Sequence, residues 1–204
     1  MKKATISPEQ ALQKLLAGNA RFLKSPGGGR SRVTEEARRA LVDGQAPFAA
    51  VLTCADSRTP PEHLFDAGLG ELFVCRNAGN LADKVTLGSL EYAVAHLGCT
   101  LVAVMGHNRC GAVAAAVAAA MAPGKHESEN LDAIVTRIIP AVLATRKEGQ
   151  SREAWVDEAA KRNVRDTCAE IARNSPIISE KAAFGAVAVK ALWYDLESGR
   201  VSEL

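Results

Sequence analysis

Two segments, Cys54-Ala55-Asp56-Ser57-Arg58 and Gly106-His107-Asn108-Arg109-Cys110-Gly111, are the most informative feature of this chain. Together they hold two thiols, an imidazole and a carboxylate, which are all side chains that zinc accepts as ligands. The pair formed by His107 and Cys110 has the H-x-x-C spacing that lets both side chains reach one metal ion. Cys54 lies far upstream, whereas zinc ribbons and fingers present two compact ligand pairs. The sequence therefore predicts a zinc site that is assembled by tertiary structure.

Each of these segments follows a short apolar run, as does a third polar segment after residue 75. The runs cover 48–53, 71–75 and 101–105. Continuous apolar strands separated by helices indicate a parallel sheet that is covered on both faces. In such sheets ligands bind at the carboxyl ends of the strands, where every candidate residue falls. We therefore expect an α/β fold with a central, mainly parallel β-sheet flanked by helices.

The rest of the chain is expected to form one domain over 1–204, with an N-terminal helical arm at 1–43, a zinc-site core at 44–122, and a helical segment with C-terminal strands at 123–204. The arm begins with Ser7-Pro8-Glu9-Gln10, which has the pattern of a capping box, and looks detached from the core. A partner subunit is one candidate for covering its apolar face.

Further helices and strands follow from the spacing of apolar residues and from turn residues. The expected helices cover 34–42, 86–97, 111–122, 131–147 and 153–173. A long strand at 184–196, a turn at 197–199 and an edge strand at 200–204 are expected to end the chain.

Composition excludes several classes of partner. The 204 residues carry a formal net charge of +2, with both signs mixed throughout, and only 4% aromatic residues. Neither nucleic acid nor a membrane surface is therefore an expected partner. The longest apolar run, at 112–122, is too short to span a bilayer. Five cysteines, an odd number, are typical of a reducing compartment, so we expect a cytoplasmic protein.

The order and spacing of six segments identify a resemblance that covers nearly the whole chain. The segments are Cys54-Ala55-Asp56-Ser57-Arg58, Gly70-Glu71-Leu72-Phe73-Val74, Arg76-Asn77-Ala78-Gly79-Asn80, Glu91-Tyr92-Ala93-Val94, Gly106-His107-Asn108-Arg109-Cys110-Gly111 and Tyr194-Asp195-Leu196-Glu197-Ser198-Gly199. This chain resembles the β-class carbonic anhydrases, and in particular their plant-type active-site subgroup.

The resemblance implies a zinc enzyme that hydrates carbon dioxide reversibly to bicarbonate and a proton. One Zn²⁺ per subunit would be held by Cys54, His107 and Cys110. Asp56 and Arg58 would form a catalytic pair beside the metal. Three protein ligands and one exchangeable position are what a catalytic zinc needs, whereas a structural zinc has four protein ligands. If Arg58 holds Asp56, the fourth position is open to water; if Asp56 swings free, its carboxylate closes the site.

The resemblance also assigns a substrate pocket. Gln45 matches a glutamine that donates a hydrogen bond to substrate, and Phe73 and Tyr92 match aromatic residues that line the pocket. In the family the glutamine and tyrosine positions face each other across a dimer interface, so a homodimer or higher homo-oligomer is expected. Val51 stands where the subgroup regulated by bicarbonate has a tryptophan, so no such inhibitory site is expected.

Two other functions stay open from the sequence. The same scaffold could hydrolyse a sulfur analogue such as carbonyl sulfide or carbon disulfide, because a linear apolar triatomic molecule would meet the same site. Alternatively, the zinc could be structural, and the chain a binding protein without catalysis. The presence of Asp56, Arg58 and Gln45 favours catalysis over the second alternative.

Overall fold

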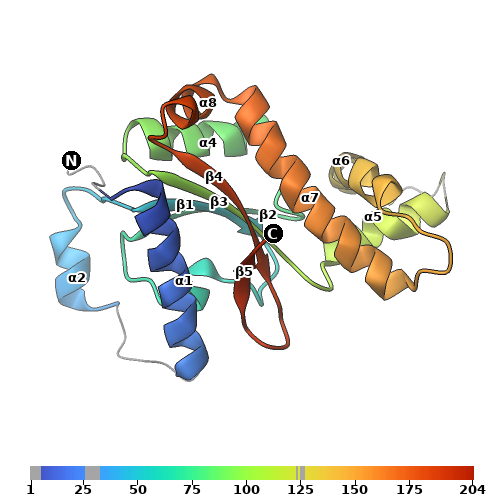
Figure 1. Cartoon of the computed structure of the whole chain (residues 1–204), viewed down its shortest axis with the longest axis horizontal. Helices are drawn as coiled ribbons and strands as arrows, with labels where there is room; N and C mark the ends of the chain where they lie inside the picture. The colour runs from blue at the N-terminus through green and yellow to red at the C-terminus, as the bar shows by residue number, and fades with distance from the viewer. Residues whose placement is uncertain (1–5, 26–32, 123, 125–126) are drawn as a thin grey trace.

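The computed structural model describes residues 6–25, 33–122, 124 and 127–204 (Figure 1). The strands are β1 (Ala49–Cys54), β2 (Leu72–Asn77), β3 (Leu101–His107), β4 (Ala188–Tyr194) and β5 (Val201–Glu203). The helices are α1 (Pro8–Lys24), α2 (Glu35–Ala40), α3 (Pro61–Leu64), α4 (Lys84–Ala95), α5 (Gly111–Met121), α6 (Glu129–Ala144), α7 (Arg152–Asn174) and α8 (Pro176–Ala183).

The sheet has the strand order β2-β1-β3-β4-β5. The pairs β1–β2, β1–β3 and β3–β4 are parallel, and β4–β5 is antiparallel. The expected fold, a mainly parallel sheet flanked by helices, is therefore confirmed, as is the edge strand at the C-terminus. Because β1 and β3 are parallel neighbours, their carboxyl ends meet at one edge of the sheet.

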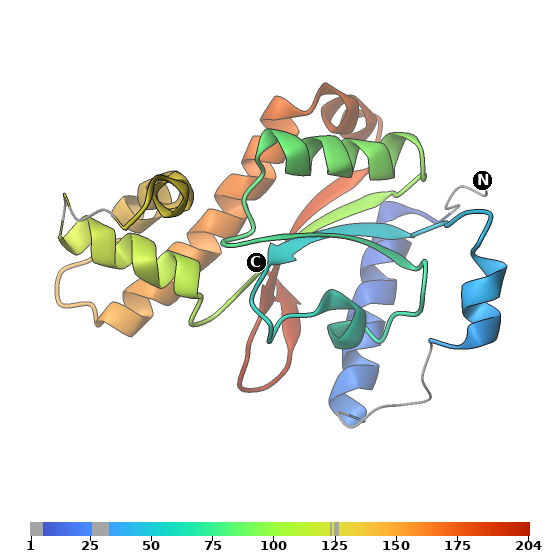
Figure 2. The ribbon, with the colours of Figure 1, turned by 180° about the vertical axis from the view of Figure 1, so that it is seen from behind.

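Both faces of the sheet are covered, which explains why β1 and β3 are buried along their whole length. One face packs against α1 and α3 through the alternate residues Ala49, Val51, Leu101, Ala103 and Met105. The other packs against α4, α7 and α8 through Ala50, Leu52, Val102 and Val104. Figure 2 shows the sheet between these two layers.

Helix α1 begins as expected, since the Ser7 hydroxyl accepts from the N–H of Gln10 and the Gln10 side chain accepts from the N–H of Ser7. The expectation that this arm is detached from the core was wrong, however. Ala11, Leu12 and Leu15 are buried in the first core cluster of their own chain. The apolar face of α1 is therefore covered without a partner, whereas α2 contributes no buried residue.

Two short helices, α3 and α8, were not expected. The chain leaves α8 through a turn in which the N–H of Gly185 donates to the carbonyl of Ala182. Strand β4 therefore covers Ala188–Tyr194 rather than the predicted 184–196. Ser175 is both the C-cap of α7 and the N-cap of α8. Its hydroxyl accepts from the N–H of Ile178 and donates to Glu91 Oε1 at 2.6 Å.

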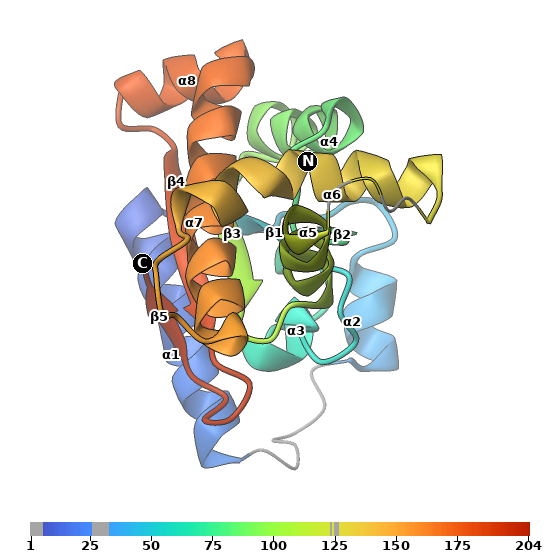
Figure 3. The ribbon, with the colours of Figure 1, turned by 90° about the vertical axis from the view of Figure 1, so that its right-hand side faces the viewer.

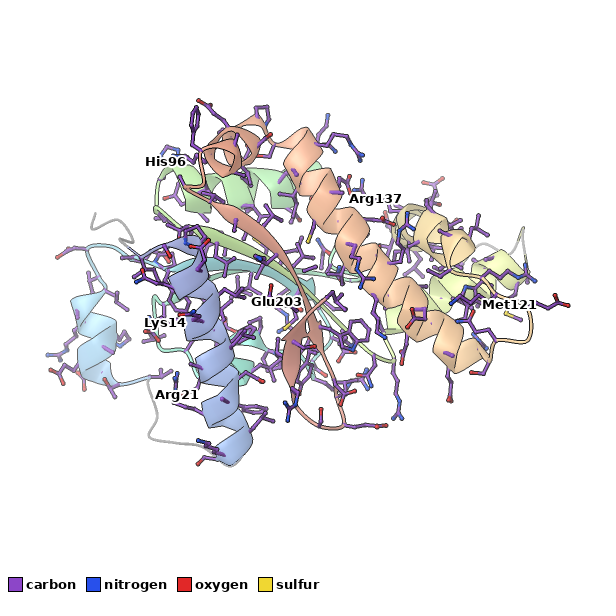
Figure 4. All side chains as sticks on the ribbon, in the orientation of Figure 1. Lys14, Arg21, His96, Met121, Arg137 and Glu203 are labelled. Carbon is purple, nitrogen blue, oxygen red and sulfur yellow. The ribbon has the colours of Figure 1, made fainter. Side chains whose placement is uncertain are left out.

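Helices α5, α6 and α7 form a third packed cluster beyond the carboxyl edge of the sheet, seen in front of it in Figure 3. Arg137 on α6, labelled in Figure 4, forms an ion pair with Glu170 of α7 at 2.6 Å. Trp155 of α7 donates to the carbonyl of Val142 at 2.9 Å. In the part of the chain that the structure describes, no helix is long and apolar enough to cross a membrane.

Candidate metal centre

Three buried side chains meet at the carboxyl edge of the sheet. Cys54 ends β1, His107 ends β3, and Cys110 is the N-cap of α5. One ligand atom from each lies within 4.8 Å of the others, and the two sulfur atoms are 3.9 Å apart. The sheet order explains this meeting, because the strands that carry Cys54 and His107 are neighbours.

The His107 ring is oriented for a metal. Its Nδ1 lies 2.8 Å from the backbone carbonyl oxygen of Asn108. A carbonyl can only accept a hydrogen bond, so Nδ1 carries the proton and Nε2 offers its lone pair. Nε2 is buried and has no hydrogen-bond partner among the described residues. An unsatisfied buried acceptor is costly, and a bound cation would satisfy it.

The two thiols lie within hydrogen-bond distance of each other. A bond in which the S–H of Cys110 donates to the sulfur of Cys54 lowers the pKa of Cys54 and raises the pKa of Cys110. A divalent cation that binds here would displace the proton between the two sulfur atoms, because cysteine binds metal as the thiolate. Two thiolates with one imidazole are a donor set that suits zinc. The residues present therefore fit the metal.

Asp56 lies beside the three ligand atoms, and Arg58 holds it. Arg58 donates from Nε to Asp56 Oδ1 at 2.9 Å and from Nη2 to Oδ2 at 2.7 Å, and its backbone N–H also donates to Oδ1 at 2.9 Å. These bonds lower the pKa of Asp56 to about 2, so the carboxylate is ionised. Its Oδ2 is 4.0 Å from Nε2 of His107. Of the two arrangements considered from the sequence, the structure has the one in which Arg58 holds Asp56.

Two residues outside the predicted site, Arg76 and Thr59, support the Cys54–Asp56 turn. Arg76 donates from Nε to the carbonyl of Cys54 at 3.0 Å and from Nη2 to the carbonyl of Asp56. The Thr59 hydroxyl lies 3.0 Å from the same Asp56 carbonyl. Arg76 lies near the end of β2, where it pairs with Thr53 of β1. It is also the first residue of the third polar segment in the sequence, and this was the available signal.

Comparison with known proteins identifies the family. The family model described as carbonic anhydrase matches residues 49–201. A carbonic anhydrase 2 of Mycobacterium tuberculosis is 41% identical over 197 residues, covering 95% of this chain and 91% of the relative. A crystal structure of a β-carbonic anhydrase from Aspergillus fumigatus superposes with a TM-score of 0.75 at 26% identity, over 96% of this chain and 89% of that one. The chain belongs to the β-class carbonic anhydrases.

A second solved structure extends this comparison to assembly. One of two tetrameric β-carbonic anhydrases from Sordaria macrospora superposes with a TM-score of 0.70 at 26% identity, covering 96% of this chain and 95% of that one.

Membership of a carbonic anhydrase family accounts for the Cys-His-Cys cluster. Neither hydrolysis of a sulfur analogue nor a purely structural zinc is needed to explain it.

The three pocket residues expected of a carbonic anhydrase do not join the metal ligands within one chain. Phe73 pairs with Ala50, four positions before the pairing of Asn77 with Cys54, which places it roughly 13 Å back along the sheet. Tyr92 lies in the last turn of α4, 46% exposed, with its ring 6.2 Å from that of Phe73. Gln45 is exposed, just before β1. All three therefore lie toward the amino ends of the strands.

Proposed function

We propose that this chain catalyses the reversible hydration of carbon dioxide to bicarbonate and a proton, with one Zn²⁺ per subunit held by Cys54, His107 and Cys110. The observation that carries the assignment is the buried three-residue cluster in which Nε2 of His107 has no partner among the described residues. When bound, zinc acidifies the water that it holds and so supplies a nucleophile near neutral pH.

Asp56 and Arg58 have distinct roles in this proposal. Arg58 holds the carboxylate ionised and back from the three ligands, which leaves one position for water, as a catalytic rather than a structural zinc requires. Asp56, whose Oδ2 faces the ligand atoms, accepts a hydrogen bond from the attacking water and orients it. If Arg58 released it, the same carboxylate would become a fourth ligand and close the site.

The substrate pocket is proposed to form between two chains. Gln45 donates to a substrate oxygen, and Phe73 and Tyr92 provide apolar lining, in the zinc site of a partner subunit. The exposure of Gln45 and Tyr92 and the distance of Phe73 from Cys54 in the same chain support this arrangement. So does the position of β2 at the edge of the sheet, where a second chain can approach. A homodimer or a higher homo-oligomer follows, in keeping with the tetrameric relative.

A cytoplasmic location is also proposed. All five cysteines are free thiols, which is typical of a reducing compartment. Carbon dioxide and bicarbonate are the only small-molecule partners that the proposal requires.

The function is tested by stopped-flow hydration of carbon dioxide, with the zinc content of each sample measured. The zinc-loaded wild type is expected to be active, whereas Cys54→Ala is expected to lose zinc and activity together. Asp56→Ala is expected to keep zinc and lose activity. Full activity in a metal-free sample would overturn the proposal.

The shared pocket is tested by mixing two impaired variants, Cys54→Ala and Gln45→Ala, and allowing their subunits to exchange. A hybrid dimer would contain one intact site, built from Cys54 of one chain and Gln45 of the other. Random exchange in a two-fold dimer should therefore restore about a quarter of the wild-type activity. A mixture no more active than the average of its two components would contradict a site shared between chains.

A further inference from the structure

The segment between two of the metal ligands is tied to the turn that joins β4 to β5. The Asn108 side chain is nearly buried, and its Oδ1 accepts from the backbone N–H of Leu196 at 2.8 Å. Its Nδ2 donates to Oδ2 of Asp195 at 3.3 Å. One amide thus makes two hydrogen bonds to a turn that lies far away in the sequence, at the end of β4 (Figure 1).

The backbone carbonyl of Asn108 determines which ring nitrogen of His107 carries the proton. The carbonyl oxygen of Asn108 is the acceptor for Nδ1 of His107, at 2.8 Å. If the peptide group of Asn108 turned away, Nδ1 would lose its acceptor, and the ring could carry its proton on Nε2 instead. A ring protonated on Nε2 cannot bind a metal through that atom.

We propose that Asn108 is a positioning residue for His107. Its side-chain amide fixes the peptide group to the β4–β5 turn, and the fixed carbonyl keeps the proton of His107 on Nδ1, so that Nε2 is ready for zinc. The inference rests on the proposed zinc function. Asn108 touches neither metal nor substrate in this account; it acts through His107 and so sets zinc affinity and ligand geometry.

The hydrogen bonds of Asp195 allow a sharp test. Its Oδ1 accepts from the backbone N–H of Ser198 at 2.8 Å and from the Ser198 hydroxyl at 2.6 Å, which leaves Oδ2 for Asn108. Exchanging the two side chains, in the double variant Asn108→Asp with Asp195→Asn, would reverse the donor and the acceptor of the central bond. The bonds to Leu196 and Ser198 would be kept, because each new side chain still has an oxygen in the required place.

The experiment is equilibrium competition for zinc between the full-length, zinc-loaded protein and a chromophoric chelator. Outer hydrogen bonds of this kind typically change metal affinity about 10- to 100-fold, so Asn108→Ala and Asn108→Asp should weaken zinc binding by about tenfold or more. The exchanged double variant should recover most of that loss. Visible absorption of the cobalt-substituted proteins should report altered ligand geometry in both single variants and a wild-type spectrum in the double variant.

The matched control is Glu197→Ala, which removes the exposed ion pair with Arg109 in the same turn but leaves the bonds of Asn108 in place. Its zinc affinity and cobalt spectrum should equal those of the wild type. Wild-type zinc affinity in Asn108→Ala, or no recovery in the double variant, would overturn the role of Asn108 while leaving the proposed function intact. Failure of the wild type itself to bind zinc would overturn both.

Discussion

Replacement of Arg58 by alanine tests how the site is kept open. In the structure Arg58 makes two side-chain hydrogen bonds to Asp56, at 2.9 and 2.7 Å. Among the described residues, the variant would leave the Asp56 carboxylate with one hydrogen bond, from the backbone N–H of residue 58 at 2.9 Å. Because Asp56 Oδ2 already lies 4.0 Å from Nε2 of His107, a small rotation would bring the carboxylate among the ligand atoms. The expected result is a site closed by Asp56 for much of the time.

The size of the effect follows from the exposure of the pair. The Arg58 side chain is 51% exposed and that of Asp56 16%, so solvent screens the attraction. Exposed ion pairs contribute at most about 1 kcal/mol, and the two-point geometry seen here raises the value to about 2 kcal/mol. Since about 1.4 kcal/mol corresponds to a tenfold change, kcat/KM should fall by about 5- to 30-fold.

Stopped-flow hydration of carbon dioxide, with zinc content measured on the same samples, distinguishes closure from loss of metal. Arg58→Ala should retain its zinc, because the three ligands are unchanged and a fourth becomes available. Arg58→Lys, which keeps the charge but cannot make the two-point contact, should show an intermediate rate. Wild-type kcat/KM in Arg58→Ala at full zinc occupancy would show that Arg58 does not keep the site open.

Three further outcomes are expected. Gly18→Ala would place a Cβ against the backbone carbonyl of Phe65 and should destabilise the fold by about 1–3 kcal/mol, lowering Tm by roughly 2–12 °C. Gly88→Ala is the control, since among the described residues its Cβ would meet nothing within 4 Å. Its free energy of unfolding should rise by up to about 1 kcal/mol. Equal Tm changes in the two variants would contradict the packing of α1 on its own chain. Asn19→Ala removes hydrogen bonds to Leu64, Gly199 and Val201 and should lower the free energy of unfolding in urea by about 2–4 kcal/mol. An unchanged urea midpoint would show that these hydrogen bonds contribute nothing to stability. Removal of zinc by a chelator should lower Tm, because free zinc at a thousandfold excess over Kd adds about 4 kcal/mol to the free energy of unfolding. A Tm that does not respond to zinc would argue against a zinc site in the folded protein.

The sheet and the ligand cluster could be predicted from the sequence for local reasons. Strands buried on both faces are apolar without alternation, and this makes the runs before Cys54 and before His107 easy to recognise. The spacing of His107 and Cys110 depends only on a strand end and the first turn of a helix. The sequence also suggested that Arg58 could hold Asp56, but only the structure shows which of the two arrangements the chain adopts.

The remaining features depend on contacts between distant residues, which a local pattern does not contain. The apolar face of α1 predicts burial but does not say against which surface, so its packing beside Phe65 was missed. Helix α8 was missed because Ser175 both follows the end of α7 and caps the next helix. The contact of Asn108 with the β4–β5 turn joins residues 87 positions apart and has no local signal.

In the proposed function, hydration of carbon dioxide depends on one zinc ion bound by Cys54, His107 and Cys110. Zinc is titrated into metal-free protein while the hydration rate and the bound zinc are measured together. Activity should rise in proportion to bound zinc and stop rising at one ion per chain, and Cys110→Ala should show neither binding nor activity. Activity before zinc is added, or a Cys110→Ala variant with the wild-type profile, would contradict the proposed function.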